Sequence, residues 1–398
     1  MIRSYNAQRE TMQSLTVGRS LKICLASMAP FVGGAEVAAE RLAIGLRDAG
    51  HDVFIVLGTR TKVYERMEKM RLRCVHAPMF HTDKWHMIRY WSACRSLRSL
   101  LRAEQPDVIH SNDLPTHQIV ADAACPLGIP RICHHRFPYD GSCIDWLNKF
   151  GAERHLFVSN SFMKDMIARS PRLAASSRGV VHDGIPIPPL PRIEERRQSR
   201  TRLGLPLDKH IVLLAGQVIE VKGVADLLHA WMMLGEDVRQ KAELVVVGDD
   251  LQSAGKYRFE MEELARGLGC PARFVGFQAN MADWQMTADL AVVPSHVEPF
   301  GLVIVEAMAF EVPVVACAVG GINETMVPGE TGLLVPPRSP EQLAGAIDRL
   351  LRNGEMRRRM GAAGRRRCEE NFSIKAHTQK ILDEYSQVLY QRQEVFGR

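Results

Sequence analysis

Residues 295–332 read SHVEPFGLVIVEAMAFEVPVVACAVGGINETMVPGETG, and the interpretation of the chain starts from them. Two carboxylates in this stretch, Glu298 and Glu306, are separated by seven residues, with a Pro-Phe-Gly turn and an apolar run between them. The preceding residues, 290–293, form a short apolar run stopped by proline, which predicts a buried strand. A helix is then expected to begin at the turn, at the carboxyl end of a parallel strand, where open α/β sheets bind ligands.

The glutamate pair alone is weak evidence for a functional site, because two glutamates about two helical turns apart often mark a solvated helix face. Here Glu298 lies in a turn, and the residues beside Glu306 are apolar and small. The free N–H groups and the dipole at the start of a helix also attract phosphate. The stretch therefore favours a ligand-binding loop over a plain surface helix.

The bulk composition indicates a globular protein of two domains. The chain has 398 residues, with 46% hydrophobic and 24% charged side chains and a net charge of +6. Two domains of about 200 residues each are the natural expectation for this length. A mildly basic chain suits anionic ligands or an anionic membrane surface, and we expect no nucleic-acid partner.

The nine cysteines include no CxxC pair and show no zinc spacing, so we expect reduced, mostly buried thiols in a cytoplasmic protein and no metal site. Residues 1–20 have no apolar core, so they predict a disordered tail and no signal peptide. No run of about eighteen apolar residues is present, and no membrane span is predicted.

The first half of the chain opens as strand, glycine loop, helix and strand, over residues 21–28, 29–34, 35–49 and 51–57. The loop contains Gly33 and Gly34 but is not a GxGxxG motif with an acidic residue about twenty positions later. A nicotinamide dinucleotide is therefore disfavoured. The paired glycines either let the backbone approach a ligand or form an ordinary tight turn.

Polar residues follow two later strands of this half. His110, Ser111 and Asn112 end the strand and loop at 106–112, while His134 and His135 follow a strand expected at 131–133. Histidines at strand ends can bind metals, but no acidic or cysteine partner stands at ligand spacing. A hydrogen-bonded loop histidine is the alternative to a functional one.

A helix is expected over residues 84–102, with Trp85, Tyr90 and Trp91 near several arginines. A basic face with aromatic residues can lie on a membrane surface. The same pattern also fits an ordinary surface helix with one packed stripe, and we favour that reading.

The remaining chain repeats the α/β alternation. A strand and turn are expected at 155–161 and again at 180–186, and further strands at 210–215, 244–248, 273–276 and 290–293. Helices are expected at 224–234, 257–268, 281–288, 339–351, 357–367 and 373–390. The proline-rich residues 185–191 are expected to connect the two domains, and residues 192–202 follow as a charged run. Five or more strand–helix units after residue 210 predict a second doubly wound parallel sheet.

The order Glu-Pro-Phe-Gly-Leu-x3-Glu-Ala-Met-Ala, then Pro-Val-Val-Ala and Gly-Gly-x-x-Glu, closely resembles the donor-sugar motif of retaining family 4 glycosyltransferases. This resemblance implies the GT-B fold, an α/β architecture of two Rossmann-like doubly wound parallel-sheet domains facing across a cleft. The implied domains are 1–187 on the acceptor side and 188–372 for the nucleotide sugar. Residues 373–398 would form a helix crossing back to the first domain.

The resemblance also assigns roles to single residues. Lys222 would neutralise the donor diphosphate from the loop 216–223, in which Gln217 stands where the family usually has arginine. Glu298 would hold the donor sugar and Glu306 the ribose. Val275 and Phe277 would line the nucleotide base. The turn and first helical amides would come from Pro299, Phe300, Gly301 and Leu302. Gly33 and Gly34 would let the backbone approach the ligand. A histidine of the first domain would reach the donor sugar, and we favour His134 over His135.

The implied activity is the transfer of a hexose-type sugar from a nucleotide-diphosphate sugar to an acceptor hydroxyl, with retention and without metal or cofactor. The implied acceptor is a glycan or a lipid-linked acceptor in polysaccharide or glycolipid biosynthesis. The basic charge, the helix at 84–102 and the lack of a signal-peptide pattern favour a cytoplasmic enzyme near the inner face of a membrane. Double displacement through a glutamate and front-face attack both stay open. A non-catalytic or regulatory sugar-nucleotide-binding protein is the alternative.

Overall fold

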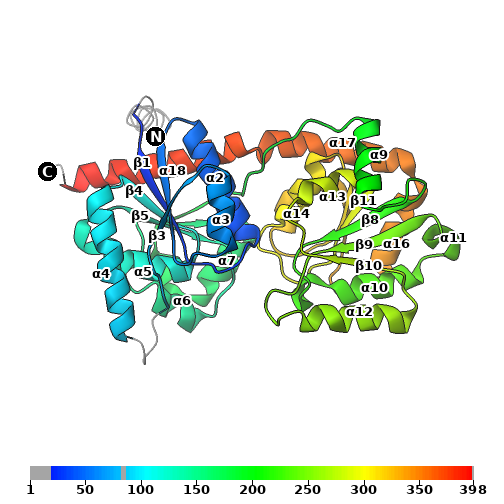
Figure 1. The fold of residues 1–398 in the computed structure, drawn as a ribbon, viewed down its shortest axis with the longest axis horizontal. Coiled ribbons are helices and arrows are strands. Elements are labelled where there is room, and N and C mark those ends of the chain that lie inside the picture. The colour runs from blue at the N-terminus through cyan, green and yellow to red at the C-terminus, as the bar shows by residue number, and fades with distance from the viewer. Residues whose placement is uncertain (1–18, 82–86, 397–398) are drawn as a thin grey trace. The chain divides into compact units, whose positions relative to one another are not determined.

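The computed structural model describes residues 19–81 and 87–396, and these divide into two compact units. Unit 1 comprises the described residues up to Pro186 and those from Ile374 onward, and unit 2 comprises Ile187–Ser373. Each unit consists of a parallel sheet with helices packed against it (Figure 1). The expected tail at residues 1–20 falls almost wholly outside the described residues, as does Trp85.

The sheet of unit 1 has seven parallel strands in the order β3-β2-β1-β4-β5-β6-β7. The strands are β1 (Lys22–Ser27), β2 (Asp52–Leu57), β3 (Arg73–His76), β4 (Val108–Ser111), β5 (Arg131–His135), β6 (Arg154–Phe157) and β7 (Arg178–Val180). The helices are α2 (Gly34–Asp48), α3 (Lys62–Lys69), α4 (Met87–Glu104), α5 (Leu114–Ala124), η1 (Cys125–Leu127), α6 (Gly141–Leu147), α7 (Asn160–Arg169), α8 (Pro171–Ala175) and α18 (Ile374–Phe396).

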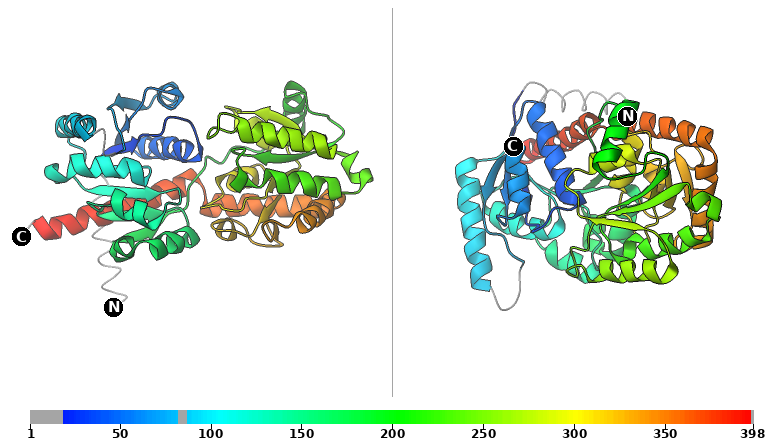
Figure 2. Two further views of the ribbon diagram at one scale, coloured as in Figure 1. Left: turned by 90° about the horizontal axis from the view of Figure 1, so that it is seen from below. Right: turned by 45° about the vertical axis from the view of Figure 1, so that its right-hand side comes forward.

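Helices cover both faces of this sheet. One core joins α2 and α18 to β1 and β2, and Tyr385 of α18 is fully buried in it. The other core joins α4 and α5 to the opposite face, where Phe54 of β2 is fully buried. The end of the chain therefore packs into the same unit as its beginning, as the red and blue ribbons of Figure 2 show.

The sheet of unit 2 has six parallel strands in the order β10-β9-β8-β11-β12-β13. The strands are β8 (His210–Ala215), β9 (Ala242–Val247), β10 (Arg273–Gly276), β11 (Leu290–Val293), β12 (Val314–Cys317) and β13 (Gly332–Val335). The helices are α9 (Ile193–Arg202), η2 (Glu220–Lys222), α10 (Val224–Met233), α11 (Glu236–Arg239), α12 (Lys256–Leu268), α13 (Met281–Thr287), α14 (Leu302–Ala309), α15 (Ile322–Thr325), α16 (Pro340–Arg352) and α17 (Gly354–Asn371).

The strands of unit 2 lie in its core because their sequences are apolar. Val245, Val246 and Val247 of β9 are fully buried, as expected for a parallel strand covered on both faces. Trp231 of α10 is also fully buried and anchors the core shared with α12 and α16. The two doubly wound α/β sheets expected from the sequence are confirmed.

Several local predictions were wrong. The strands β4 and β5 continue through His110 and His135, so these histidines lie inside the sheet and not in loops. β7 ends at Val180, where a strand was expected to begin. In the segment 155–161, by contrast, β6 ends at Phe157 and α7 begins at Asn160, in agreement with the expected strand and turn.

The charged run at 192–202 forms α9 of unit 2, and the proline-rich residues 185–191 contain the boundary between the two units, after Pro186. Arg196 and Arg200 of this helix bind Asp289 at 2.7 and 2.6 Å, so two ion pairs, one of them from the buried Arg200, fix the helix within unit 2. These pairs leave no local signal in the sequence, because Asp289 lies 93 residues from Arg196 and 89 residues from Arg200.

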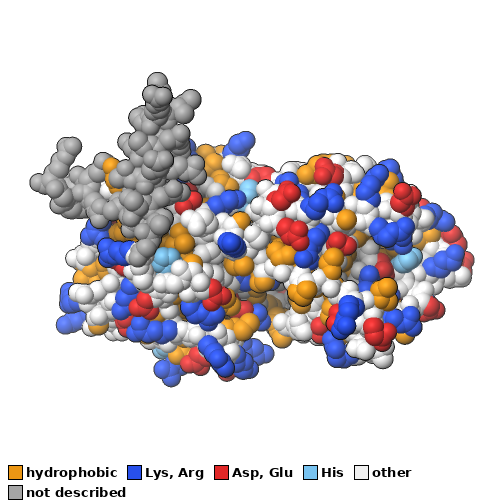
Figure 3. Space-filling model, turned by 90° about the horizontal axis from the view of Figure 1, so that it is seen from above, with side chains coloured by type: hydrophobic (Ala, Val, Ile, Leu, Met, Phe, Trp, Pro, Cys, Tyr) orange, Lys and Arg blue, Asp and Glu red, His pale blue; other side chains and the backbone are white. Residues whose placement is uncertain are grey.

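The surface shows no extended patch of one charge on the face drawn in Figure 3, where basic and acidic side chains are interspersed. Such mixing is typical of a solvated face. All nine cysteines are free thiols. Among the helices of the described residues, none combines the length and the apolarity that crossing a bilayer requires.

Candidate active site

The carboxyl ends of β8 and β11 lie side by side in unit 2, at the point where the strand order reverses. A loop leads from β8 to Lys222 at the end of η2, and another leads from β11 to Glu298. The two loops are bonded to each other, since the backbone N–H of His296 donates to the carbonyl of Val221 at 2.8 Å. Open α/β sheets bind ligands at such a reversal, so this edge is the natural candidate site.

Lys222 and Glu298 form an ion pair at this edge. The Lys222 Nζ atom lies 2.5 Å from Glu298 Oε2, and the side chains are 27% and 11% exposed. Ser295 Oγ also donates to Glu298 Oε2 at 3.4 Å. The structure therefore brings together two of the predicted site residues, and each neutralises the charge of the other.

Gln217 and the ion pair line the same small cavity. This cavity has a volume of about 20 Å³. That volume holds about one water molecule, far less than a diphosphate needs. The Oε1 atom of Gln217 accepts a hydrogen bond of 3.5 Å from Nε2 of Gln252. Gln217 supplies an amide where an arginine would supply a positive charge.

The turn before α14 depends on glycine. Gly301 is the N-cap residue and has φ +95°, a left-handed conformation that side chains rarely adopt. Gly321 donates its N–H to the carbonyl of Glu298 at 2.9 Å. A Cβ atom on Gly320 would lie 2.2 Å from that same carbonyl oxygen. The Gly-Gly pair of the motif therefore supports the loop that carries Glu298.

The other predicted residues of the motif occupy distinct places. Phe300 is buried and packs edge-on against Phe372, with ring centroids 5.7 Å apart. Pro299 is half-buried, and Leu302 begins α14 with a half-buried side chain. Glu306 is half-buried in the second turn of the helix.

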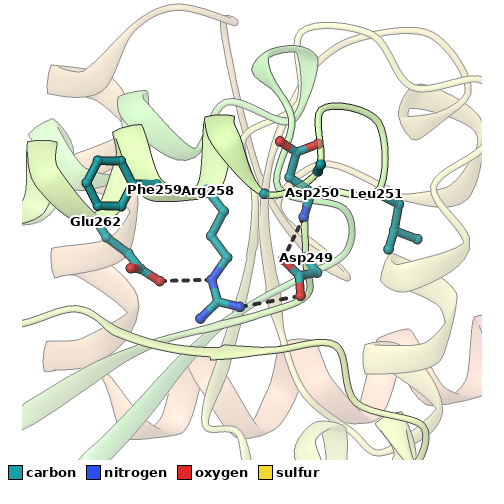
Figure 4. Close-up of a pocket in the computed structure, with 8 residues that line it drawn as sticks. Asp249, Asp250, Leu251, Arg258, Phe259 and Glu262 are labelled. Carbon is teal, nitrogen blue, oxygen red and sulfur yellow. Dashed lines mark hydrogen bonds and ion pairs between the residues drawn. The ribbon is translucent and has the colours of Figure 1, made fainter.

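A larger pocket of about 380 Å³ opens beside the segment predicted to line the base (Figure 4). Its charged wall is fixed, because Arg258 binds Glu262 at 2.8 Å and Asp249 at 3.4 Å. A Cβ atom on Gly276 would lie 2.9 Å from an Arg258 nitrogen, so the end of β10 adjoins this wall.

The predicted base residues flank that glycine: Val275 is half-buried, and Phe277 is 48% exposed. Phe259 is also exposed and faces the same pocket, as Figure 4 shows. Asp250 lies in the loop that closes the pocket. Hydrogen bonds, chiefly from Ser253, lower the pKa of Asp250 to about 2, and this carboxylate orders the loop.

In unit 1, Gly33 and Gly34 stand at the start of α2. Gly33 has φ −119°, and a Cβ atom on Gly34 would meet no other atom within 4 Å. The backbone conformation of Gly33 therefore does not demand glycine, and the packing around Gly34 does not either. The N–H of Gly33 donates to Glu36 Oε2 at 2.9 Å, and burial raises the pKa of Glu36 to about 7.

Both candidate histidines are enclosed. His134 has no exposed surface, its Nδ1 atom lies 3.2 Å from Nε2 of His110, and its Nε2 atom has no partner among the described residues. His135 bonds to His155 at 2.9 Å and stacks on Phe157. His134 and His135 were expected to follow the strand, and this prediction was wrong, because both are buried residues of β5.

One group in unit 1 has the residue types of a metal site. Cys133, His135 and His155 are buried, and their potential ligand atoms lie within 4.8 Å of one another. Burial lowers the pKa of His135 to about 3 and raises that of the Cys133 thiol. In the structure these residues form a neutral cluster, with one histidine bonded to the other.

The helix predicted over 84–102 is α4, whose described part begins at Met87. Tyr90 is buried and donates its hydroxyl to Asp122. Ile88 and Trp91 are 88% and 56% exposed, beside the exposed Arg89 and Arg95. One face of α4 packs on the sheet, while the other presents apolar and basic side chains.

Comparisons with known proteins agree with this architecture. The family model described as Glycosyltransferase Family 4 matches residues 32–187, and the one described as Glycosyl transferases group 1 matches residues 195–367. A D-inositol 3-phosphate glycosyltransferase of Xylanimonas cellulosilytica is 37% identical over 210 residues, 52% of this chain and 49% of that protein. An uncharacterized glycosyltransferase of Methanocaldococcus jannaschii is 28% identical over 80% of this chain and 85% of its own length.

The first of these matches spans about half the length of the curated relative. Among solved structures, HepE of Anabaena in complex with UDP and glucose has a TM-score of 0.81 at 20% identity, covering 92% of this chain and 99% of that one. Sucrose-phosphate synthase of Thermosynechococcus elongatus has a TM-score of 0.77 at 23% identity, covering 94% and 100%. The two family models and the shared fold together show that the chain belongs to the glycosyltransferases of the GT-B fold, with a family 4 domain followed by a group 1 domain.

Proposed function

We propose that this chain is a retaining glycosyltransferase that moves a hexose-type sugar from a nucleotide-diphosphate sugar to an acceptor hydroxyl. The observation that carries the proposal is the pairing of Lys222 with Glu298 at the strand reversal of unit 2. Each group has a natural partner in such a donor, the lysine in the diphosphate and the carboxylate in the sugar hydroxyls. HepE, crystallised with UDP and glucose, supports a donor of this class.

The main chemical task is to stabilise the negative charge that develops on the leaving nucleoside diphosphate. The Lys222 ammonium would do this as a point charge, once the phosphate takes the place of Glu298. The N–H groups that follow Gly301 would add hydrogen bonds from the start of α14. Gln217 would donate an uncharged hydrogen bond, so Lys222 would supply most of the charge.

Glu298, once released from Lys222, would bind the sugar hydroxyls and face the cationic anomeric carbon. Glu306 would hold the ribose hydroxyls two helical turns further on. The base would lie against Val275 and Phe277, at the mouth of the pocket that Arg258 borders. No metal or cofactor has a part in this proposal, because the lysine and the helix amides would carry the charge.

The acceptor would be a glycan or a lipid-linked glycan, used in polysaccharide or glycolipid biosynthesis at the inner face of the membrane. Exposed Ile88 and Trp91 beside Arg89 support contact with an anionic bilayer, because apolar side chains insert while basic ones meet the headgroups. Sedimentation with anionic vesicles at low salt tests this part. Equal sedimentation of the wild type and an Ile88→Ser, Trp91→Ser variant would contradict it.

The alternative is a non-catalytic or regulatory protein that binds sugar nucleotides. Gln217 favours it, because the diphosphate site lacks one of its two usual cations. A thermal-shift screen over nucleotide sugars, followed by assay of transfer and hydrolysis, separates the two functions. We expect a donor both to raise the melting temperature and to be consumed. A donor that is bound but never turned over would establish the alternative, and binding by none would refute both.

A further inference from the structure

A buried chain of polar side chains runs through unit 1 from the C-terminal helix to the edge of the sheet. The Tyr385 hydroxyl of α18 lies 2.8 Å from Nδ1 of His110, and Nε2 of His110 lies 3.2 Å from Nδ1 of His134. Arg136 reaches the same Nδ1 atom of His134 at 3.3 Å. These four side chains are all at least 95% buried, so water does not compete for their hydrogen bonds.

The chemistry of arginine fixes the direction of this chain. A guanidinium only donates hydrogen bonds, so Nδ1 of His134 must be an acceptor and its proton must lie on Nε2. Nε2 of His110 must then donate to His134, which leaves Nδ1 of His110 bare. Tyr385 is therefore the donor to His110. Both histidines are neutral, because burial lowers the pKa of each well below its ordinary value.

The far end of the chain holds the loops of unit 1. Arg136 forms an ion pair with Asp183 after β7 and donates from Nε to Asn112 Oδ1 after β4 at 2.9 Å. Asn112 in turn donates to the carbonyl of Ala35 in the first turn of α2 at 3.1 Å. Three loops at the carboxyl edge of the sheet therefore depend on the orientation of one guanidinium.

We propose that Tyr385 and His110 are positioning residues, which fix the tautomer of His134 and, through it, the orientation of Arg136 and the loops that it binds. The effect of these loops on turnover rests on the proposed function, whereas the assignment of the tautomers is independent of it. In this assignment His134 acts on Arg136 and does not touch the sugar. The C-terminal helix thereby shapes the ligand edge of unit 1 from more than two hundred residues away in sequence.

The Tyr385→Phe variant tests the proposal, because it removes one hydroxyl and keeps the buried ring. Long-range ¹H–¹⁵N NMR of the histidines should show bare Nδ1 and protonated Nε2 for both His110 and His134 in the wild type. In the variant His110 should lose that single tautomer. Turnover should fall about fivefold, the rate equivalent of one hydrogen bond, while the affinity of unit 2 for nucleoside diphosphate stays unchanged.

Tyr90→Phe is the matched control, since Tyr90 is also buried in unit 1 and also donates its hydroxyl, to Asp122. It should leave the His110 spectrum and turnover unchanged. A proton on Nδ1 of His110 in the wild type would overturn the proposal, as would an unchanged His110 spectrum in Tyr385→Phe. An equal loss of turnover in Tyr90→Phe would also overturn it. If the wild type transfers no sugar, the NMR result still decides the tautomers and only the proposed function fails.

Discussion

Glu298→Gln should separate donor binding from transfer. In the structure the Lys222 ammonium is held by Glu298 at 2.5 Å, so under the proposed function a diphosphate competes with the carboxylate for the charge of the lysine. Glutamine keeps the shape and removes the competing charge. We therefore expect the variant to bind nucleoside diphosphate more tightly than the wild type, although it transfers no sugar.

The magnitude follows from the exposure of the pair. Because both side chains retain some contact with solvent, 27% for Lys222 and 11% for Glu298, the pair is worth about 1 kcal/mol. That energy corresponds to a factor of about five in the dissociation constant. Isothermal titration calorimetry with the nucleoside diphosphate found in the donor screen measures it directly.

Glu330→Gln is the matched control, because Glu330 is an exposed glutamate in the turn before β13 of the same unit. It should leave the dissociation constant unchanged. If Glu298→Gln bound the diphosphate no more tightly than the wild type while keeping its melting temperature, the competition between carboxylate and phosphate would be refuted.

Three further predictions concern charge and stability. Gln217→Arg should strengthen diphosphate binding by roughly tenfold, in line with about 1.4 kcal/mol for a charged hydrogen bond. The affinity should also depend more steeply on salt in titrations at about 50 and about 200 mM salt. An unchanged affinity would show that Gln217 is not part of the diphosphate site. Acid should destabilise unit 1, because burial lowers the pKa of His117 and His377 to about 4, below the ordinary 6.5. Above pH 6.5 both histidines are neutral in the folded and the unfolded chain, and the contribution of their burial to stability is complete. As the pH falls toward 4, protonation favours the unfolded chain and that stability is lost. Urea titrations should then show a loss on the order of 2 kcal/mol per histidine between pH 7.5 and 5, and a pH-independent midpoint would contradict this. Asp289→Asn should lower the unfolding free energy of unit 2 by about 3 kcal/mol, because it leaves the buried Arg200 without its carboxylate; a loss below 1 kcal/mol in the same urea titration would show that the pair is not important.

The regular part of the fold was predictable from the sequence because its signals are local. The apolar runs at 210–215 and 290–293 coincide with β8 and β11, since buried parallel strands need continuous apolar residues. The short elements were missed. β3 and β13 have four residues each and half-buried or mixed patterns, too little for a periodic signal.

The polar interior of unit 1 could not be predicted in the same way. His134 and His135 looked like loop residues because histidines are uncommon in a buried strand. They are accommodated by partners far along the chain, His110, His155 and, through His110, Tyr385. Such partners carry no signal in local sequence.

The donor side lies between these extremes. The resemblance assigned Lys222 and Glu298 to one site, and the structure brings them into contact. That they neutralise each other depends on the path of two loops that are 76 residues apart, which no spacing rule describes. The reason for Gly320 and Gly321 is equally non-local, since they pack against the backbone of the Glu298 loop.

The most direct test of the central claim is the release of nucleoside diphosphate from a nucleotide sugar by purified wild type and Lys222→Ala. We expect steady release by the wild type in the presence of acceptor and a fall of at least about a hundredfold in Lys222→Ala, because the leaving phosphates would lose their principal cation. Undiminished release by a folded Lys222→Ala variant would contradict the account.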